Sequence, residues 1–176
     1  MDRSPAHVGL IPDGLRRWAR ANTASLADAY LRGSEKVTEI LLALQRNEVQ
    51  TASVYNLSRA NLARPDDQLE AVYAASIYFL TTLVPANFDA ATCSFRMHGD
   101  RDLLPAEFVA AAEALEATMT GPDFRINLLA AYDAEDELRS AYRRAQAQEC
   151  DINDAFEIGR AGRVVHVDEH GVELHG

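Results

Sequence analysis

A carboxylate and two guanidinium groups follow an apolar run near the start of the chain. Residues 7–11 predict a short buried strand that ends at Pro12-Asp13-Gly14, and Arg16 and Arg17 come next, in the first turn of a predicted helix. A carboxylate at the carboxyl end of a strand, beside a helix start with two guanidinium groups, suits the binding of a phosphate or diphosphate. The alternative is a plain strand–turn–helix corner, in which Asp13 caps the helix and both arginines are solvated.

Two segments resemble motifs of one enzyme family, the cis-prenyltransferases, typified by undecaprenyl diphosphate synthase. The first is the family's Met-Asp-Gly-Asn-x-Arg-Trp-Ala run, which is matched here at Asp13, Gly14, Arg17, Trp18 and Ala19, while Pro12 replaces Met and Leu15 replaces Asn. The second is its Tyr-x-Phe-Ser-x-Glu-Asn-Trp-x-Arg-Pro segment, which is matched at Tyr55, Ser58, Asn61, Arg64 and Pro65. Two short motifs in the right order and at the right separation are more specific than either motif alone.

The resemblance weakens toward the C-terminus. Residues 125–132 resemble the family's Leu-Asn-x-Ala-x-Asn-Tyr segment at Asn127 and Tyr132, but Asp133-Ala-Glu-Asp replaces the Gly-Gly-Arg that follows in the family. The family's C-terminal arginine motif, on which the isopentenyl diphosphate site depends, has no match, and Arg160 and Arg163 imitate it only weakly. We expect one cis-prenyltransferase-like domain, 1–176, with a divergent tail at 151–176.

Alternating strand and helix patterns predict the elements that position these residues. Strands are predicted at 7–11, 51–57, 94–98 and 124–129, and helices at 15–29, from 33 through 44, and at 68–83, 105–119 and 135–148. Residues 164–174 alternate around an Asp-Glu-His-Gly turn, which predicts a short C-terminal hairpin. The order predicts an α/β fold with a mostly parallel central sheet flanked by helices, which the resemblance also implies.

The resemblance implies distinct roles for the matched residues. Asp13 would place Mg²⁺, because this hydrated ion needs only one or two carboxylates besides phosphate oxygens, and the ion would stabilise the departing diphosphate. The catalytic candidates are Asp13, Arg17, Ser58 and Asn61, and the substrate-binding candidates are Gly14, Leu15, Arg16, Trp18, Tyr30, Tyr55 and Arg64. In the family the helix at 68–83 walls an apolar tunnel for the prenyl chain, so Tyr73, Tyr78, Phe79 and Leu83 are either tunnel lining or ordinary core.

Departures from the family favour an unusual reaction over ordinary chain elongation. Leu15 replaces an Asn that assists proton removal in the family, and Leu26 and Tyr30 fall where two polar diphosphate contacts belong. We therefore expect a Mg²⁺-dependent prenyltransferase or terpene synthase that ionises a short allylic prenyl diphosphate, with head-to-middle coupling or cyclisation as outcomes. The alternatives are a non-catalytic subunit that stabilises a complete cis-prenyltransferase, and an unrelated phosphate-binding α/β domain. Because family members are homodimers, the expected protein partner is a second copy or a related subunit.

Composition excludes several classes of partner. The formal net charge of −10 argues against a general affinity for nucleic acid, so an anion site must be a local basic pocket. The longest apolar stretches, such as 72–84, fall short of a membrane span, and no signal-peptide pattern is present, so we expect a cytoplasmic protein without an integral membrane segment. Cys93 and Cys150 lack the spacing of metal ligands.

Overall fold

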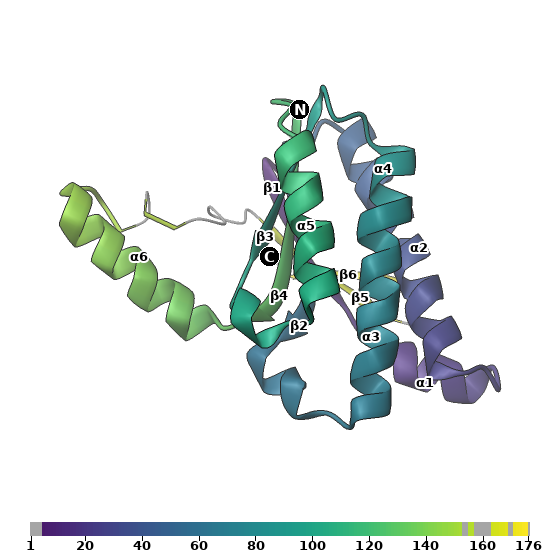
Figure 1. The fold of residues 1–176 in the computed structure, drawn as a ribbon. Coiled ribbons are helices and arrows are strands. Elements are labelled where there is room, and N and C mark those ends of the chain that lie inside the picture. The colour runs from purple at the N-terminus through teal and green to yellow at the C-terminus, as the bar shows by residue number, and fades with distance from the viewer. Residues whose placement is uncertain (1–4, 153–154, 157–162, 169–170, 176) are drawn as a thin grey trace.

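Six strands form one sheet in the order β3-β4-β2-β1-β5-β6 (Figure 1). The computed structural model describes residues 5–152, 155–156, 163–168 and 171–175, with side chains as far as Phe156. The strands are β1 (His7–Pro12), β2 (Thr51–Ser58), β3 (Cys93–His98), β4 (Phe124–Tyr132), β5 (Arg163–Asp168) and β6 (Gly171–His175). Neighbouring strands pair in parallel except β5 and β6, which are antiparallel. The predicted α/β fold with a mostly parallel sheet is confirmed, and so is the pairing of the hairpin strands, although its turn at 169–170 lies outside the described residues.

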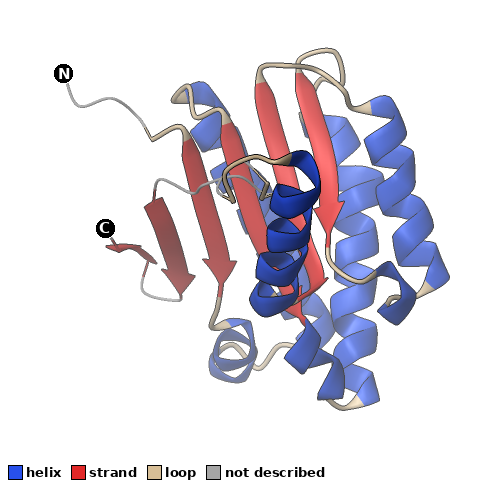
Figure 2. Cartoon of the chain, turned by 90° about the vertical axis from the view of Figure 1, so that its left-hand side faces the viewer, coloured by secondary structure: helices blue, strands red, loops and turns tan. Residues whose placement is uncertain are grey.

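Helices lie on both sides of the sheet. They are α1 (Leu15–Ala21), α2 (Leu26–Arg46), α3 (Asp66–Tyr78), α4 (Val84–Asn87), α5 (Ala106–Thr118) and α6 (Ala134–Gln148), with the short turns η1 (Arg59–Ala63), η2 (Phe79–Leu83) and η3 (Arg101–Leu103). In Figure 2, α6 lies in front of the sheet and the other long helices lie behind it. The core therefore forms between the sheet and α2, α3 and α5, where Phe95, Phe108 and Leu41 are fully buried. Burial of such a side chain stabilises the fold by about 1.5–3 kcal/mol.

The second helix begins earlier than its apolar stripe suggests. A capping box starts α2, because the Ser25 hydroxyl accepts the Asp28 N–H at 3.0 Å and the Asp28 carboxylate accepts the Ser25 N–H at 3.4 Å. The single helix predicted at 15–29 is therefore interrupted at 22–25, and its last residues, Leu26–Ala29, belong to α2, so the predicted start at Gly33 is wrong. Gly33 lies inside α2, where a Cβ would come within 2.8 Å of Leu15 Cδ1, so glycine allows α1 to approach α2 closely.

One continuous helical stretch, Asp66–Asn87, is long and apolar enough to cross a membrane by length and composition. The π-helical turn η2 joins α3 to α4 within it. The stretch packs against α2 and α5, and 33% of its most apolar window is buried. Core helices of water-soluble proteins meet the same criterion, so this single helix is weak evidence for a membrane segment.

A row of buried polar side chains crosses four of the parallel strands, β1 to β4. His7 on β1 hydrogen-bonds to Ser53 on β2 at 2.8 Å, and the amide of Asn127 on β4 donates to the same Ser53 hydroxyl at 3.1 Å. Asn127 also hydrogen-bonds to His98 on β3 at 3.2 Å. Because Asn127 is only 1% exposed, its amide depends on these contacts in place of water.

β2 and β4 each contain one extra residue near their carboxyl ends. The pairs along this stretch are Tyr55–Leu129, Leu57–Ala130 and Ser58–Tyr132. Asn56 is therefore a β-bulge in β2, and Ala131 is one in β4. Ala131 is buried with a φ of 49°, which a residue with a Cβ rarely adopts. The two bulges offset each other, so the strands regain their register at their ends.

Candidate active site

A cavity of about 520 Å³ lies at the carboxyl ends of β1 and β2. The catalytic candidates that line it are Asp13, Arg17, Ser58 and Asn61, and the substrate-binding candidates that line it are Gly14, Leu15, Arg16, Tyr30, Tyr55 and Arg64. Trp18, which is half-buried on α1, is not among the lining residues. Segments far apart in the sequence thus meet in one place, as the sheet topology requires.

The turn from β1 into α1 holds the carboxylate of Asp13 at the cavity. Gly14, with a φ of 87°, is the N-cap residue, so the alternative in which Asp13 caps the helix is wrong. One Asp13 oxygen accepts the Gly14 N–H at 2.6 Å, and the other accepts a hydrogen bond from Arg17 Nη2 at 3.3 Å. The side chain of Asp13 is 52% exposed and that of Arg17 54%, so a ligand in the cavity can reach both charges.

The 3₁₀ turn after β2 positions a second guanidinium group. The Ser58 hydroxyl accepts the Asn61 N–H at 3.0 Å and caps η1, and Arg64 follows as the residue that ends the turn. Arg64 Nη1 then donates to the hydroxyl of Tyr30 at 3.4 Å. Ser58 and Asn61 therefore hold the loop that carries Arg64, in addition to lining the cavity.

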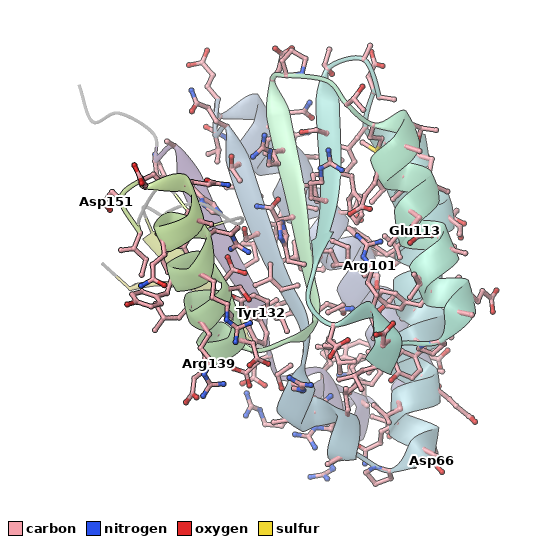
Figure 3. The ribbon with its side chains drawn as sticks, turned by 60° about the vertical axis from the view of Figure 1, so that its left-hand side comes forward. Asp66, Arg101, Glu113, Tyr132, Arg139 and Asp151 are labelled. Carbon is pink, nitrogen blue, oxygen red and sulfur yellow. The ribbon has the colours of Figure 1, made fainter. Side chains whose placement is uncertain are left out.

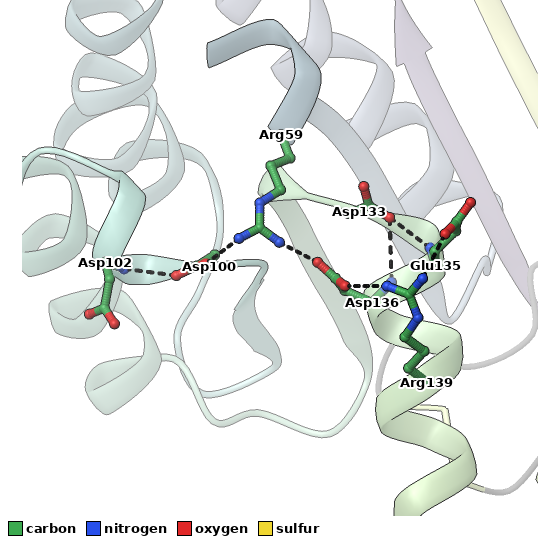
Figure 4. A network of polar contacts seen from close by, with 7 residues as sticks. All are labelled: Arg59, Asp100, Asp102, Asp133, Glu135, Asp136 and Arg139. Atoms are coloured by element: carbon green, nitrogen blue, oxygen red, sulfur yellow. Dashed lines mark hydrogen bonds and ion pairs between the residues drawn. The ribbon is translucent and has the colours of Figure 1, made fainter. Parts of the chain in front are cut away.

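A network of ion pairs connects η1 to the start of α6 (Figure 4). The Arg59 guanidinium pairs with Asp136 on α6 and with Asp100 at 3.2 Å, and Asp136 also accepts from Arg139 at 3.2 Å. Asp133 caps α6 by accepting the Glu135 N–H at 2.8 Å. Exposed pairs of this kind stabilise a fold by about 0–1 kcal/mol each, so the network serves mainly to orient η1 relative to α6.

The cavity is basic at one end and apolar at the other. Of the described residues that line it, Arg16, Arg17 and Arg64 are basic and only Asp13 is acidic. The buried part of the wall is mostly apolar, because it includes Val37, Val54, Val72, Ala75, Phe79 and Leu128, with Ser76 as a polar member. A chain with a net charge of −10 therefore does contain a local basic pocket.

Sequence reasoning missed much of the apolar wall. Of the four candidates for tunnel lining on the long helix, Phe79 lines the cavity, whereas Tyr73 packs edge-on against Phe108 at a ring separation of 6.3 Å. The cavity-facing positions on the helix are Val72, Ala75, Ser76 and Phe79. Their i, i+3, i+4, i+7 spacing is a helix-face signal, but small and polar members hide it among stronger apolar positions.

Two tyrosines pack together at the carboxyl ends of β2 and β4, and one of them, Tyr55, lines the cavity. The rings of Tyr55 and Tyr132 meet edge to face at 5.9 Å, and Tyr132 lies at the end of β4 beside the start of α6 (Figure 3). Burial, together with the nearby Asp133 carboxylate, raises the pKa of Tyr55. Burial also raises the pKa of Tyr132 to about 12. Both phenols are therefore protonated at neutral pH, which argues against Tyr55 as a general base.

Asp13 is the carboxylate available for a metal at this site. Within the part of the chain that the structure describes, no group of three or more His, Cys, Asp or Glu side chains could hold a metal ion. A metal in the cavity would therefore share one carboxylate with oxygens from a ligand or from water, which is a donor set that suits Mg²⁺. Arg160 lies outside the described residues, and the side chain of Arg163 is not described, so neither is placed relative to the cavity.

Known proteins resemble this chain over most of its length. A (2Z,6E)-farnesyl diphosphate synthase of Mycolicibacterium smegmatis is 34% identical over 155 residues, which cover 82% of this chain and 55% of that protein. A short-chain Z-isoprenyl diphosphate synthase of Mycobacterium leprae is 33% identical over 154 residues, which cover 84% of this chain and 56% of that protein. This chain therefore spans about half the length of these curated relatives.

Solved structures share the fold. The lavandulyl diphosphate synthase of Lavandula x intermedia, determined in complex with dimethylallyl diphosphate, superposes with a TM-score of 0.74 at 21% identity, covering 84% of this chain and 64% of that one. A prenyltransferase family model that describes undecaprenyl diphosphate synthases matches residues 11–170. Because that match includes both motifs, the cavity and most of the sheet, the chain belongs to the undecaprenyl diphosphate synthase family of prenyltransferases.

Proposed function

We propose that this chain binds a short allylic prenyl diphosphate and breaks its carbon–oxygen bond, as a Mg²⁺-dependent prenyltransferase or terpene synthase. The observation that carries the proposal is the division of the cavity into a basic end and a buried apolar wall. A molecule with an anionic head and a hydrocarbon tail matches both parts. Farnesyl and short-chain Z-isoprenyl diphosphates, which appear in the names of two relatives, are molecules of this kind.

The residues of the basic end would bind and orient the diphosphate. Arg17 and Arg64 can each donate two hydrogen bonds to phosphate oxygens, while Asp13 and Tyr30 hold their guanidinium groups in place. When the carbon–oxygen bond breaks, the diphosphate leaves with the bonding electron pair. The allylic cation then loses a proton or is attacked by a second prenyl unit. The buried wall excludes water from that cation, and the departing diphosphate can accept the proton that the cation loses.

Mg²⁺ fits the donor set at the basic end. Asp13 offers one half-exposed carboxylate, and the substrate would supply the remaining anionic oxygens. When bound, the ion would add positive charge where negative charge accumulates on the leaving diphosphate. Asp13 and the substrate would hold it jointly, so metal affinity should be weak without substrate.

One observation favours the alternative of a non-catalytic subunit. Leu15, at the position where the family has Asn, lies against Gly33 in an apolar contact and offers no polar group to the cavity.

In either case we propose association with a second copy or a related subunit, because α6 leaves Leu138 and Tyr142 exposed at 50% and 55%. The native mass in solution tests that association. A cytoplasmic location stays a prediction.

Turnover of allylic diphosphates tests the proposed function. The purified protein and its Asp13→Asn variant are incubated with Mg²⁺ and C5, C10 or C15 allylic diphosphates, with and without isopentenyl diphosphate, and diphosphate release and organic products are measured. Asp13→Asn should lower the rate by roughly 10²–10³-fold, as expected for the loss of one group that stabilises transition-state charge. The control is Asp123→Asn, which changes an exposed aspartate just before β4, away from the cavity.

The pattern of products separates the possible reactions. Product from an allylic substrate alone would support an ionising synthase or head-to-middle coupling, whereas product that requires isopentenyl diphosphate would support ordinary elongation. If no prenyl diphosphate is bound or turned over, the enzyme proposal is wrong. The subunit alternative is then tested by adding a complete cis-prenyltransferase and measuring binding and stimulation.

A further inference from the structure

Two polar side chains interrupt the apolar wall of the cavity. Asn56 on β2 and Ser76 on α3 both line it, next to Val54, Val72 and Phe79. The Asn56 amide donates from Nδ2 to Ser76 Oγ at 2.9 Å, and the Ser76 hydroxyl donates to the Val72 carbonyl at 2.8 Å. Ser76 is 5% exposed and Asn56 is half-buried, so the pair forms part of the inner wall of the cavity.

The hydrogen count leaves part of the Asn56 amide available. A serine hydroxyl has one hydrogen, and the Val72 carbonyl at 2.8 Å takes it in preference to Asn56 Oδ1 at 3.4 Å. The Asn56 carbonyl oxygen therefore keeps its acceptor capacity, and Nδ2 keeps a second hydrogen. The Asn56 amide is half-buried and lines the cavity, so it can bind a further partner there, either a ligand group or a water molecule.

The β2 bulge explains why Asn56 reaches the cavity. Successive residues of a regular strand point to opposite faces of the sheet, yet Tyr55 and Asn56 both line this cavity. Asn56 is the bulged residue, and Ala131 adopts a left-handed conformation in the offsetting bulge of β4. Bulges of this kind re-aim side chains beside functional sites, and the strained backbone at Ala131 is consistent with such a role.

We propose that Asn56 and Ser76 form a polar subsite that takes one hydroxyl group or one water molecule, and that this subsite makes the cavity select short or hydroxylated prenyl chains. The inference rests on the proposed function and names the class of tail that the same site accepts. A short chain leaves the water on the amide in place, and a chain with a hydroxyl group at its far end replaces that water. A longer hydrocarbon chain removes the water, covers the amide and leaves it unpaired, which disfavours binding of that chain.

Binding of four diphosphates to matched variants tests the subsite. The probes are dimethylallyl, geranyl and farnesyl diphosphates, and a geranyl diphosphate hydroxylated at its far end. Asn56→Leu keeps the size of the side chain and removes its polarity, whereas Asn56→Ala removes both. Ser76→Ala removes the partner hydroxyl and serves as the second variant if Asn56→Leu does not fold.

We expect the preference for the hydroxylated chain to be lost when the polar group of Asn56 is removed. The wild-type protein should bind the hydroxylated geranyl diphosphate at least about tenfold more tightly than geranyl diphosphate. Asn56→Leu should abolish that ratio and strengthen farnesyl diphosphate binding by roughly tenfold, with dimethylallyl diphosphate binding unchanged.

Two results would overturn the inference. If Asn56→Leu leaves every ratio unchanged while Asn56→Ala strengthens farnesyl diphosphate binding, space alone sets the selection, and the polar pair only links β2 to α3. That result leaves the proposed function standing, because dimethylallyl diphosphate still binds. If the wild-type protein binds none of the four probes, the proposed function is wrong, and so is the proposed subsite.

Discussion

Replacing Gly33 with alanine should have two opposing effects on the free energy of unfolding, a gain from helix propensity and a loss from packing. Inside a helix, alanine is more favourable than glycine by about 1 kcal/mol. At this position, however, a Cβ would lie 2.8 Å and 2.9 Å from the two Leu15 Cδ atoms, which is closer than van der Waals contact allows. Displacing a packed side chain typically costs about 1–3 kcal/mol. The free energy of unfolding of Gly33→Ala should therefore be lower than that of the wild-type protein by about 1 kcal/mol.

The same substitution should stabilise the protein once Leu15 is shortened. In a Leu15→Ala background both Cδ atoms are gone, and only the propensity gain of about 1 kcal/mol remains. The difference between the two backgrounds is a coupling free energy of about 2 kcal/mol, with opposite signs for one substitution. Urea unfolding of the four proteins measures it, and thermal melts should show it as a shift of roughly 4–8 °C.

Additive effects would refute this account of the α1–α2 contact. If Gly33→Ala changes stability equally in both backgrounds, within about 0.5 kcal/mol, Leu15 does not occupy the space above Gly33. Because Leu15 also lines the cavity, Gly33→Ala should weaken dimethylallyl diphosphate binding in the wild-type background by displacing Leu15, and should not weaken it further in the Leu15→Ala background. Loss of binding in both would place the cause elsewhere in α2.

Three further predictions concern the sheet. Gly99→Ala should lower the unfolding free energy by at least about 3 kcal/mol. Gly99 has a φ of 126°, and a Cβ there would lie 1.9 Å from the Ala130 carbonyl oxygen. A melting temperature close to that of the wild-type protein would contradict this prediction. Asn127→Ala should lower the unfolding free energy by about 3 kcal/mol, because the hydrogen bonds to Ser53 and His98 are lost inside the sheet, and urea unfolding tests this. Since Tyr132 has a pKa of about 12 when folded and about 10 when unfolded, the folded state holds its proton more tightly. The contribution of Tyr132 to the unfolding free energy should be fully present below a pH of about 10 and should be lost as the pH rises toward about 12. In Tyr132→Phe, the unfolding free energy should therefore change less with pH over this range.

The sequence predicts the elements well where one periodicity dominates. The strand predicted at 124–129 is confirmed, and β4 extends further, from Phe124 to Tyr132, and is buried almost throughout. The start of α2 was mispredicted, because the Ser25–Asp28 capping box lies outside the apolar stripe that begins after Gly33. A local hydrogen-bonding pattern decided that boundary, and hydrophobic periodicity does not register it.

The site could be predicted only in its polar part. Of the ten residues that match the two motifs, seven line one cavity, because the topology brings the carboxyl ends of β1 and β2 together. Asn56 was not predicted as a site residue, because it occupies a variable position in the second motif and reaches the cavity through a bulge. Nothing about an alanine at position 131 signals a φ of 49°, so the offsetting bulge could not be anticipated either.

The paired bulges also bear on how this chain can tolerate insertions and deletions. Removing Asn56 alone would shift β2 by one residue against β4 and turn Ser58, with the loop that carries Arg64, toward the wrong face. Removing Ala131 as well would restore the register and relieve the left-handed backbone. Single-residue deletions at these two positions should therefore be tolerated together and not singly.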